Sequence, residues 1–185
     1  MHNYLRGFLL SLAVGAGLLC APTVDAQRIA LKTNTLDWVT LQPNAIFEAQ
    51  LSPRISLQLG VAGNPFKFDV AKWNWRNWRV EPEIRYWFNR PMACHFLALS
   101  ATATGFNLHS SSTRLVGDAV GVGLSYGYAL VLAKQWNVEF ELGAGIATVK
   151  GRKYPLDGEW PANKNYSKIV PVPIRAAINF SYIFR

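Results

Sequence analysis

The chain has 185 residues, a formal net charge of +8 and a length that fits one domain. Half of its residues are hydrophobic, 13% are aromatic and only 16% are charged. This composition excludes a disordered chain, and seven Trp and seven Tyr are unusual for a small soluble enzyme.

The N-terminus predicts a cleaved signal peptide. One positive charge, Arg6, precedes an apolar run that ends at Ala21 and is too short for a membrane helix. A small-x-small motif ends at Ala26. We therefore expect residues 1–26 to be removed and residues 27–185 to form the mature domain.

The cysteines and histidines predict neither a disulfide nor a metal site. The mature chain would keep one cysteine, Cys94, which cannot form an intrachain disulfide. The three histidines are scattered and show no zinc-binding spacing. We expect no cofactor. A lipoprotein modified at Cys20 is the weaker alternative to signal-peptide cleavage, because Leu19 stands where a small residue normally lies.

Apolar and polar residues alternate with a period of two along most of the mature chain. In one segment Val120, Val122 and Leu124 share a face, and Gly121 and Gly123 lie opposite. This is the pattern of a β-strand with one apolar and one polar face. It predicts eight strands, which span Arg28–Trp38, Pro43–Leu51, Arg54–Asn64, Asn77–Phe88, Cys94–Asn107, Val116–Leu132, Gln135–Lys150 and Ile169–Phe184.

Short turns and longer connections alternate between these strands. The second and third strands meet at Ser52-Pro53, whereas "FKFDVAKWNWR", "LHSSSTRL" and "GRKYPLDGEWPANKNYSK" are longer. The first connection, near Leu36–Gln42, is a short exception. An up-and-down barrel would collect the short turns at one end and the long loops at the other, as outer-membrane barrels do. An even number of strands places both termini at the short-turn end.

The two faces of the strands differ in bulk. The apolar face carries large side chains. In the last strand it holds Ile174, Ile178 and three aromatics, together with Ala176. The other face is rich in Gly, Ala, Ser and Asn. An eight-stranded barrel has a narrow interior, so we expect the small face inside. The predicted fold is all-β, an eight-stranded antiparallel up-and-down transmembrane β-barrel with a filled polar lumen. A soluble lipocalin-like carrier is an alternative.

Aromatic residues gather near both ends of the predicted strands. This distribution predicts two interfacial girdles, because amphipathic rings settle at the headgroup level of a bilayer. The two sets are Trp87, Phe88, Trp136, Tyr182 and Phe184 at the short-turn end, and Phe66, Phe68, Trp73, Trp75, Trp78 and Phe106 at the other.

Charged residues occupy the polar face of the segment "WRVEPEIRYWF". Together with the inward charges of other strands, they make four basic and five acidic residues. Because buried charges persist only when they are paired, we expect these residues to form a salt-bridged lattice. The lattice comprises Lys32, Glu48, Arg79, Glu81, Glu83, Arg85, Glu139, Glu141 and Arg175. The alternatives are a catalytic Glu81–Glu83 pair and a narrow ion path. Pro82 predicts a bulge or a local break in this strand.

The last long loop is a second candidate site. Its basic residues outnumber its acidic ones and alternate with aromatics. The candidate surface-contact residues are Lys150, Arg152, Lys153, Trp160 and Lys164. They predict contact with lipopolysaccharide phosphates or an acidic glycan, and the alternative is a solvated loop suited to an anionic outer leaflet. Nucleic acid is not an expected partner for a secreted barrel, despite the pI of 9.7.

Four segments are distinctive in combination. They are "ALKTNTLDWVTLQPN", "WRVEPEIRYWF", "HFLAL" and "GVGLSYGYALVLAKQWNVEFELGAGIA". These segments resemble Bacteroidota outer-membrane β-barrel proteins of the family known as domain of unknown function 3575. The resemblance implies an outer-membrane barrel with both termini in the periplasm, in contact with outer-membrane lipid and lipopolysaccharide. Because some members are encoded near fimbrial assembly genes, it also implies other outer-membrane or fimbrial proteins as partners. The family has no established catalytic residues.

We therefore expect a small non-enzymatic protein that is structural or adhesive, or an accessory subunit of an outer-membrane or fimbrial assembly. Three alternatives remain from the residues alone. They are a narrow pore, an outer-membrane hydrolase and the lipocalin-like carrier. For a hydrolase, His95 and His109 lack a recognisable Ser or Asp partner, although such sites are assembled in space rather than along the sequence.

Overall fold

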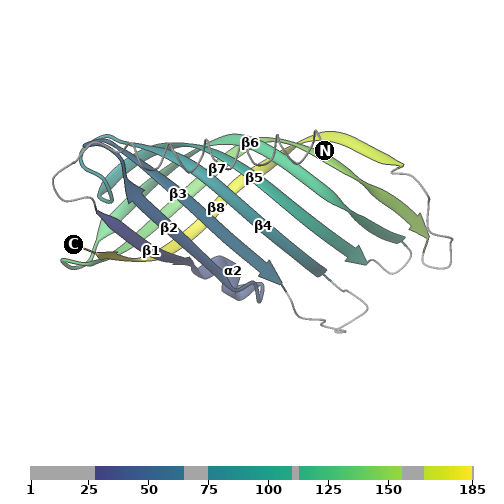
Figure 1. The fold of residues 1–185 in the computed structure, drawn as a ribbon, viewed down its shortest axis with the longest axis horizontal. Coiled ribbons are helices and arrows are strands. Elements are labelled where there is room, and N and C mark those ends of the chain that lie inside the picture. The colour runs from purple at the N-terminus through teal and green to yellow at the C-terminus, as the bar shows by residue number, and fades with distance from the viewer. Residues whose placement is uncertain (1–27, 65–74, 110–112, 156–164, 185) are drawn as a thin grey trace, which may run out of the picture.

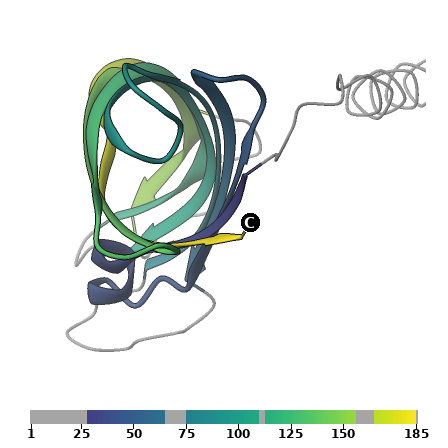
Figure 2. The same ribbon diagram turned by 90° about the vertical axis from the view of Figure 1, so that its left-hand side faces the viewer.

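The computed structural model describes residues 28–64, 75–109, 113–155 and 165–184, so the expected signal peptide lies outside the described residues. Eight antiparallel strands form one sheet, and the last strand pairs with the first, which closes a barrel (Figures 1 and 2). The strands are β1 Ile29–Asn34, β2 Asn44–Gln50, β3 Ile55–Asn64, β4 Trp75–Trp87, β5 Cys94–His109, β6 Thr113–Val131, β7 Trp136–Pro155 and β8 Tyr166–Phe184. The predicted strand number and the antiparallel arrangement are confirmed.

The first strand is shorter than predicted because a helix follows it. A single strand was expected over Arg28–Trp38, but β1 ends at Asn34 and α2 occupies Thr35–Val39. The Asn34 side chain accepts a hydrogen bond from the backbone N–H of Leu36 (3.1 Å), which is a capping contact that starts a helix. No helix in the described part of the chain is long and apolar enough to span a membrane.

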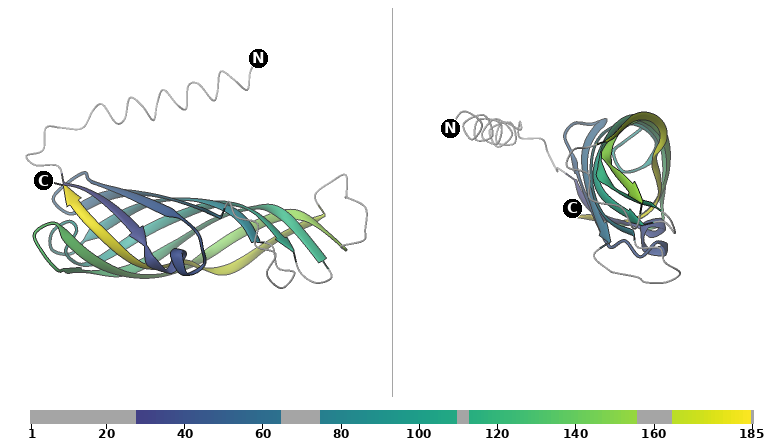
Figure 3. Two further views of the ribbon diagram at one scale, coloured as in Figure 1. Left: turned by 90° about the horizontal axis from the view of Figure 1, so that it is seen from below. Right: turned by 90° about the vertical axis from the view of Figure 1, so that its right-hand side faces the viewer.

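The barrel wall is much taller on one side than on the other. β1 and β2 have six and seven residues, whereas β7 and β8 have 20 and 19. β6, β7 and β8 run on past the other strands at the end away from the C-terminus (Figure 3). The β7–β8 ladder continues to the pair Gly151 and Tyr166, which lies beyond the predicted strand limits at Lys150 and Ile169.

Side chains alternate between the lumen and the outer surface. In β3, Ser56 and Gln58 are buried, whereas Leu57 and Leu59 are exposed. The outer wall of the taller side is apolar, and Leu142 keeps 72% of its surface exposed. Its large outward side chains include Val120, Val122, Leu124, Phe140, Leu142 and Ile146. The predicted division into a small polar inner face and a bulky apolar outer face is confirmed for these strands.

A β-bulge in the β7–β8 ladder changes one predicted orientation. The register shifts between Gly143, which pairs with Arg175, and Gly145, which pairs with Val172. The extra residue interrupts the alternation, so Ile174 and Arg175 are both buried. The prediction of Ile174 on the outer face is therefore wrong. A Cβ added at Gly123 would lie 2.8 Å from Ile174 Cγ2, so Ile174 fills the space that this glycine leaves.

Pro82 interrupts the ladder without causing a bulge. It pairs in register with Leu59 of β3. On the other side, the paired positions with β5 skip Glu81 and Pro82, and the same register resumes at Glu83 and Ser100. The local break that proline was expected to cause is present, because its nitrogen has no hydrogen to donate.

Candidate functional site in the barrel lumen

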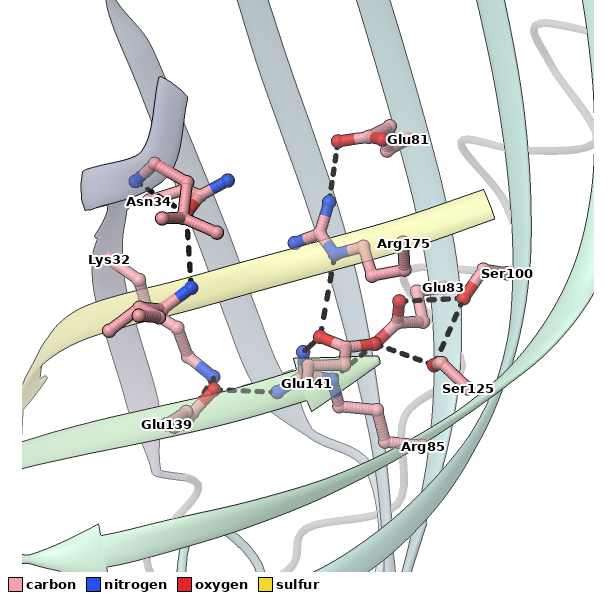
Figure 4. Close-up of polar contacts among 12 residues, drawn as sticks. Lys32, Asn34, Glu81, Glu83, Arg85, Ser100, Ser125, Glu139, Glu141 and Arg175 are labelled. Atoms are coloured by element: carbon pink, nitrogen blue, oxygen red, sulfur yellow. Dashed lines mark hydrogen bonds and ion pairs between the residues drawn. The ribbon is translucent and has the colours of Figure 1, made fainter. Parts of the chain in front are cut away.

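Arg85 is the centre of a charged network inside the barrel (Figure 4). It projects inward from β4 and is fully buried. Its guanidinium contacts Glu83 on the same strand, and Glu139 (2.8 Å) and Glu141 (2.7 Å) on β7. A fourth carboxylate, Glu48 on β2, lies 3.4 Å away. One arginine thus joins four acids from three strands.

Lys32 on β1 completes the base of this network. Its Nζ donates to both carboxylate oxygens of Glu139, at 2.6 and 2.7 Å, and also contacts Glu48. All three side chains are fully buried. Because a buried charge is tolerated only when it is paired, Lys32 offsets part of the negative charge that Arg85 alone cannot balance. We call this group with Arg85, Glu83 and Glu141 the lower tier.

A second group of charges, the upper tier, lies farther from the termini. Arg175 contacts Glu81, and lies 3.4 Å from Glu141 of the lower tier. Arg79 lies 3.1 Å from Glu81 and donates through Nη2 to both oxygens of Asp37, at 2.9 and 2.7 Å. The side chains of Arg79, Asp37 and Glu81 are 26%, 13% and 12% exposed. The lower tier is therefore fully buried, and the upper tier is partly exposed to solvent.

Serine hydroxyls satisfy further acceptors of the lower tier. Ser100 donates to Glu83 at 2.7 Å, and Ser125 donates to Glu141 at 2.6 Å. Ser56 donates to the carboxylate of Glu48. These serines face inward for the same reason as the charges, since they occupy the same alternating positions of their strands. They were not singled out from the sequence, although the two-residue period marks them.

The structure brings all nine predicted lattice residues into one network. It also adds Asp37, which the sequence did not identify because α2 replaces the end of a predicted strand. With Asp37, the network has six acids and four bases (Asp37, Glu48, Glu81, Glu83, Glu139 and Glu141 against Lys32, Arg79, Arg85 and Arg175).

Glu81 and Glu83 contact different cations. Glu83 is 3% exposed and contacts Arg85 and Ser100. Glu81 contacts Arg175 instead, in the upper tier. Their carboxylates thus belong to different arginines, and the geometry is that of paired structural charges.

Aromatic side chains close the lumen below the lower tier. The rings of Trp87 and Phe96 are fully buried and 4.7 Å apart, and the guanidinium of Arg85 lies 4.3 Å from the Phe96 ring centre. Met92 is 1% exposed. The prediction that Trp87 belongs to an interfacial girdle is wrong. Trp87 lies two residues after Arg85 on β4, so its side chain also points into the lumen, where its Nε1 donates to Ser56 at 2.8 Å.

The predicted contact loop is partly a strand. Lys150, Arg152 and Lys153 lie on β7, because the ladder continues past the predicted end of that strand. Trp160 and Lys164 lie outside the described residues. Lys150 and Lys153 are exposed and Arg152 is half-buried. These cations therefore belong to the tall side of the barrel wall.

The remaining reactive side chains that the structure describes do not form a metal site. Among the residues that the structure describes, no three His, Cys, Asp or Glu side chains are grouped as a metal site requires. Cys94 is free. His95 lies on the outer face, where its Nδ1 contacts the Tyr126 hydroxyl.

The fold and the charged lumen define a small eight-stranded β-barrel protein. The family described as "Protein of unknown function (DUF3575)" matches residues 12–184, and the chain belongs to this family. No curated protein and no solved structure matches the chain.

Proposed function

We propose that the mature chain is a non-enzymatic outer-membrane β-barrel whose role is structural or adhesive. The observation that carries this proposal is the reversal of the usual burial. Charged residues such as Arg85 and Glu139 are fully buried, while Leu142 and Leu124 are 72% and 67% exposed. A soluble barrel would lose stability by exposing such an apolar wall, whereas a bilayer would cover it.

Further features support membrane insertion. Trp136, Phe184 and Phe88 are exposed near the end that holds the termini, and Trp78 is exposed toward the other end. Such positions suit the two headgroup regions of a bilayer. Ile29 pairs with Phe184, so the described chain begins and ends at one end of the barrel, which would be periplasmic.

The network favours a structural role over the alternatives. A lipocalin-like carrier needs an apolar cavity, but this lumen is occupied by ion pairs. A hydrolase needs a free nucleophile and base, whereas the buried acids of the lower tier are all engaged by Arg85 or Lys32. The cations on β7, Lys150 and Arg152, suit the anionic lipid of an outer leaflet.

The test is the behaviour of the protein extracted from outer membranes. We expect it to require detergent for solubility and to change its gel mobility on heating, because a closed barrel resists unfolding until it is boiled. Fractionation of the unheated membranes gives its location. A protein that stays soluble without detergent, with one mobility before and after heating, would contradict the proposal.

Partners are tested on the same material. The family resemblance predicts outer-membrane or fimbrial proteins, and mild-detergent purification followed by mass spectrometry would identify what remains bound. Recovery of the barrel alone, at native expression and after gentle crosslinking, would argue against an accessory role and leave a structural one.

A further inference from the structure

The barrel wall has an opening beside β1. β1 pairs with β8 only over Asn179–Phe184. From Tyr166 to Ile178, the edge of β8 that faces away from β7 has no strand beside it among the described pairings. On the other side of this opening, β2 begins only at Asn44. We call the opening, which lies between β8 from Tyr166 to Ile178 and the start of β2, the notch.

The free edge of β8 is unsuited to adding another strand. The backbone N–H of Ile178 points into the notch, where it donates to the Asn34 side chain at 3.1 Å. The bulge shifts the alternation by one residue, which turns the nitrogens of Pro171 and Pro173 toward the same edge. Proline has no N–H and blocks strand pairing. The notch thus suits a ligand better than a pairing strand.

α2 covers this notch from outside. Leu36 lines the same outer-surface depression as Ile178 of β8. Trp38 lines a second depression with Val61 of β3. Asp37, between them, turns inward to the upper tier. The helix therefore spans from one side of the notch to the other.

Few polar contacts hold α2 in place. Thr35 Oγ1 donates to the carbonyl of Ile178 at 2.9 Å, and Trp38 Nε1 donates to Thr33 Oγ1 at 2.7 Å. The Asp37 carboxylate supplies the ion pair with Arg79. A five-residue helix has little stability of its own, so its position depends on these contacts.

Two arginines lie behind α2. Nη2 of Arg79 donates to both oxygens of the Asp37 carboxylate. Asp37 is the one acid of the described network that lies on a helix. Arg175 is 4% exposed, and its Nη2 has no hydrogen-bond partner within the described residues. Glu81 is shared between both arginines. If α2 moved outward, Arg79 would lose its ion pair with Asp37, and another anion could bind to its guanidinium in place of that carboxylate.

We infer that the upper tier binds the carboxylate head of a long-chain amphiphile that enters from the bilayer through the notch. The head would replace the Asp37 carboxylate on Arg79, with the unpartnered Nη2 of Arg175 as a second donor. The chain would lie against the apolar outer wall beside Leu36 and Trp38. The site holds a carboxylate already, which is why this head is favoured. The inference rests on the proposed membrane function.

The test uses the mature chain folded in detergent micelles, with cis-parinaric acid as a fluorescent probe and the corresponding alcohol as the head-group control. We expect the acid to bind and the alcohol not to. Asp37→Asn should tighten acid binding about tenfold, because the Asp37 carboxylate would no longer compete with the head group for Arg79. Arg79→Lys should weaken it about tenfold, because the planar fork is lost. Lys134→Gln, an exposed cation in the β6–β7 turn, should leave it unchanged.

Three results would overturn the inference. They are equal binding of acid and alcohol, unchanged affinity in Asp37→Asn, and tighter binding of dodecyl phosphate than of the acid. Heat-modifiable mobility, measured on every variant, separates the two proposals. A wild-type protein without it contradicts the membrane barrel itself, whereas a folded barrel that does not bind the acid contradicts the site alone.

Discussion

At the scale of single residues, Arg85 concentrates most of the charge pairing in the lumen. Arg85→Gln would leave Glu83 and Glu141 without their main cation in a fully buried part of the lumen. The expected cost is about 3–5 kcal/mol of unfolding free energy, the range for breaking a buried ion pair. Urea unfolding of the barrel in lipid vesicles, followed by tryptophan fluorescence, measures this change.

The matched control is Arg54→Gln. Arg54 is exposed, and its guanidinium contacts only the Tyr86 hydroxyl, at 3.2 Å, among the described contacts. Exposed charges contribute about 0–1 kcal/mol, so the unfolding midpoint should barely move. Equal shifts for Arg54→Gln and Arg85→Gln would show that the lumen network does not stabilise the barrel.

At the scale of elements, two inward glycines differ in what their strands allow. A Cβ at Gly127 of β6 would overlap the Phe96 ring and lie 2.7 Å from the Phe140 carbonyl oxygen. A Cβ at Gly60 of β3 would have Ile46 Cγ1 as its nearest neighbour, at 3.5 Å, which is an ordinary contact distance. We expect Gly127→Ala to cost about 1–3 kcal/mol through overpacking. Gly60→Ala should be neutral or slightly stabilising, and the same urea assay compares the two.

The elements also show which structure could be predicted from sequence. The inward charges were found because a narrow lumen and a two-residue period together assign every strand position to a face. The same rule places Trp87 inside, but its residue type suggested the girdle; in the lumen its ring packs beside the small Ala98 and Ala129. The rule did not predict α2 or the bulge at Ile174. The bulge depends on the pairing of β8 with β7, and α2 depends on the Asn34 cap, and periodicity contains neither.

At the scale of the whole molecule, the filled lumen predicts that the barrel does not conduct ions. The lower tier and the rings of Trp87 and Phe96 occupy its cross-section. In a planar bilayer, the folded protein should give no steady single-channel steps, whereas a porin reconstituted in the same way should. Reproducible steps from the heat-modifiable form would favour the narrow pore.

The unequal height of the wall has a consequence for the surrounding lipid. The six residues of β1 extend about 20 Å along the strand, and tilt makes the wall lower still. The apolar band of an outer-membrane barrel is about 25 Å tall. In a bilayer, the lipids beside β1 and β2 would have to compress, while those beside β7 and β8 would not. The barrel would therefore thin the bilayer on one flank only, and two copies that share this thinned patch would deform less lipid than two copies apart.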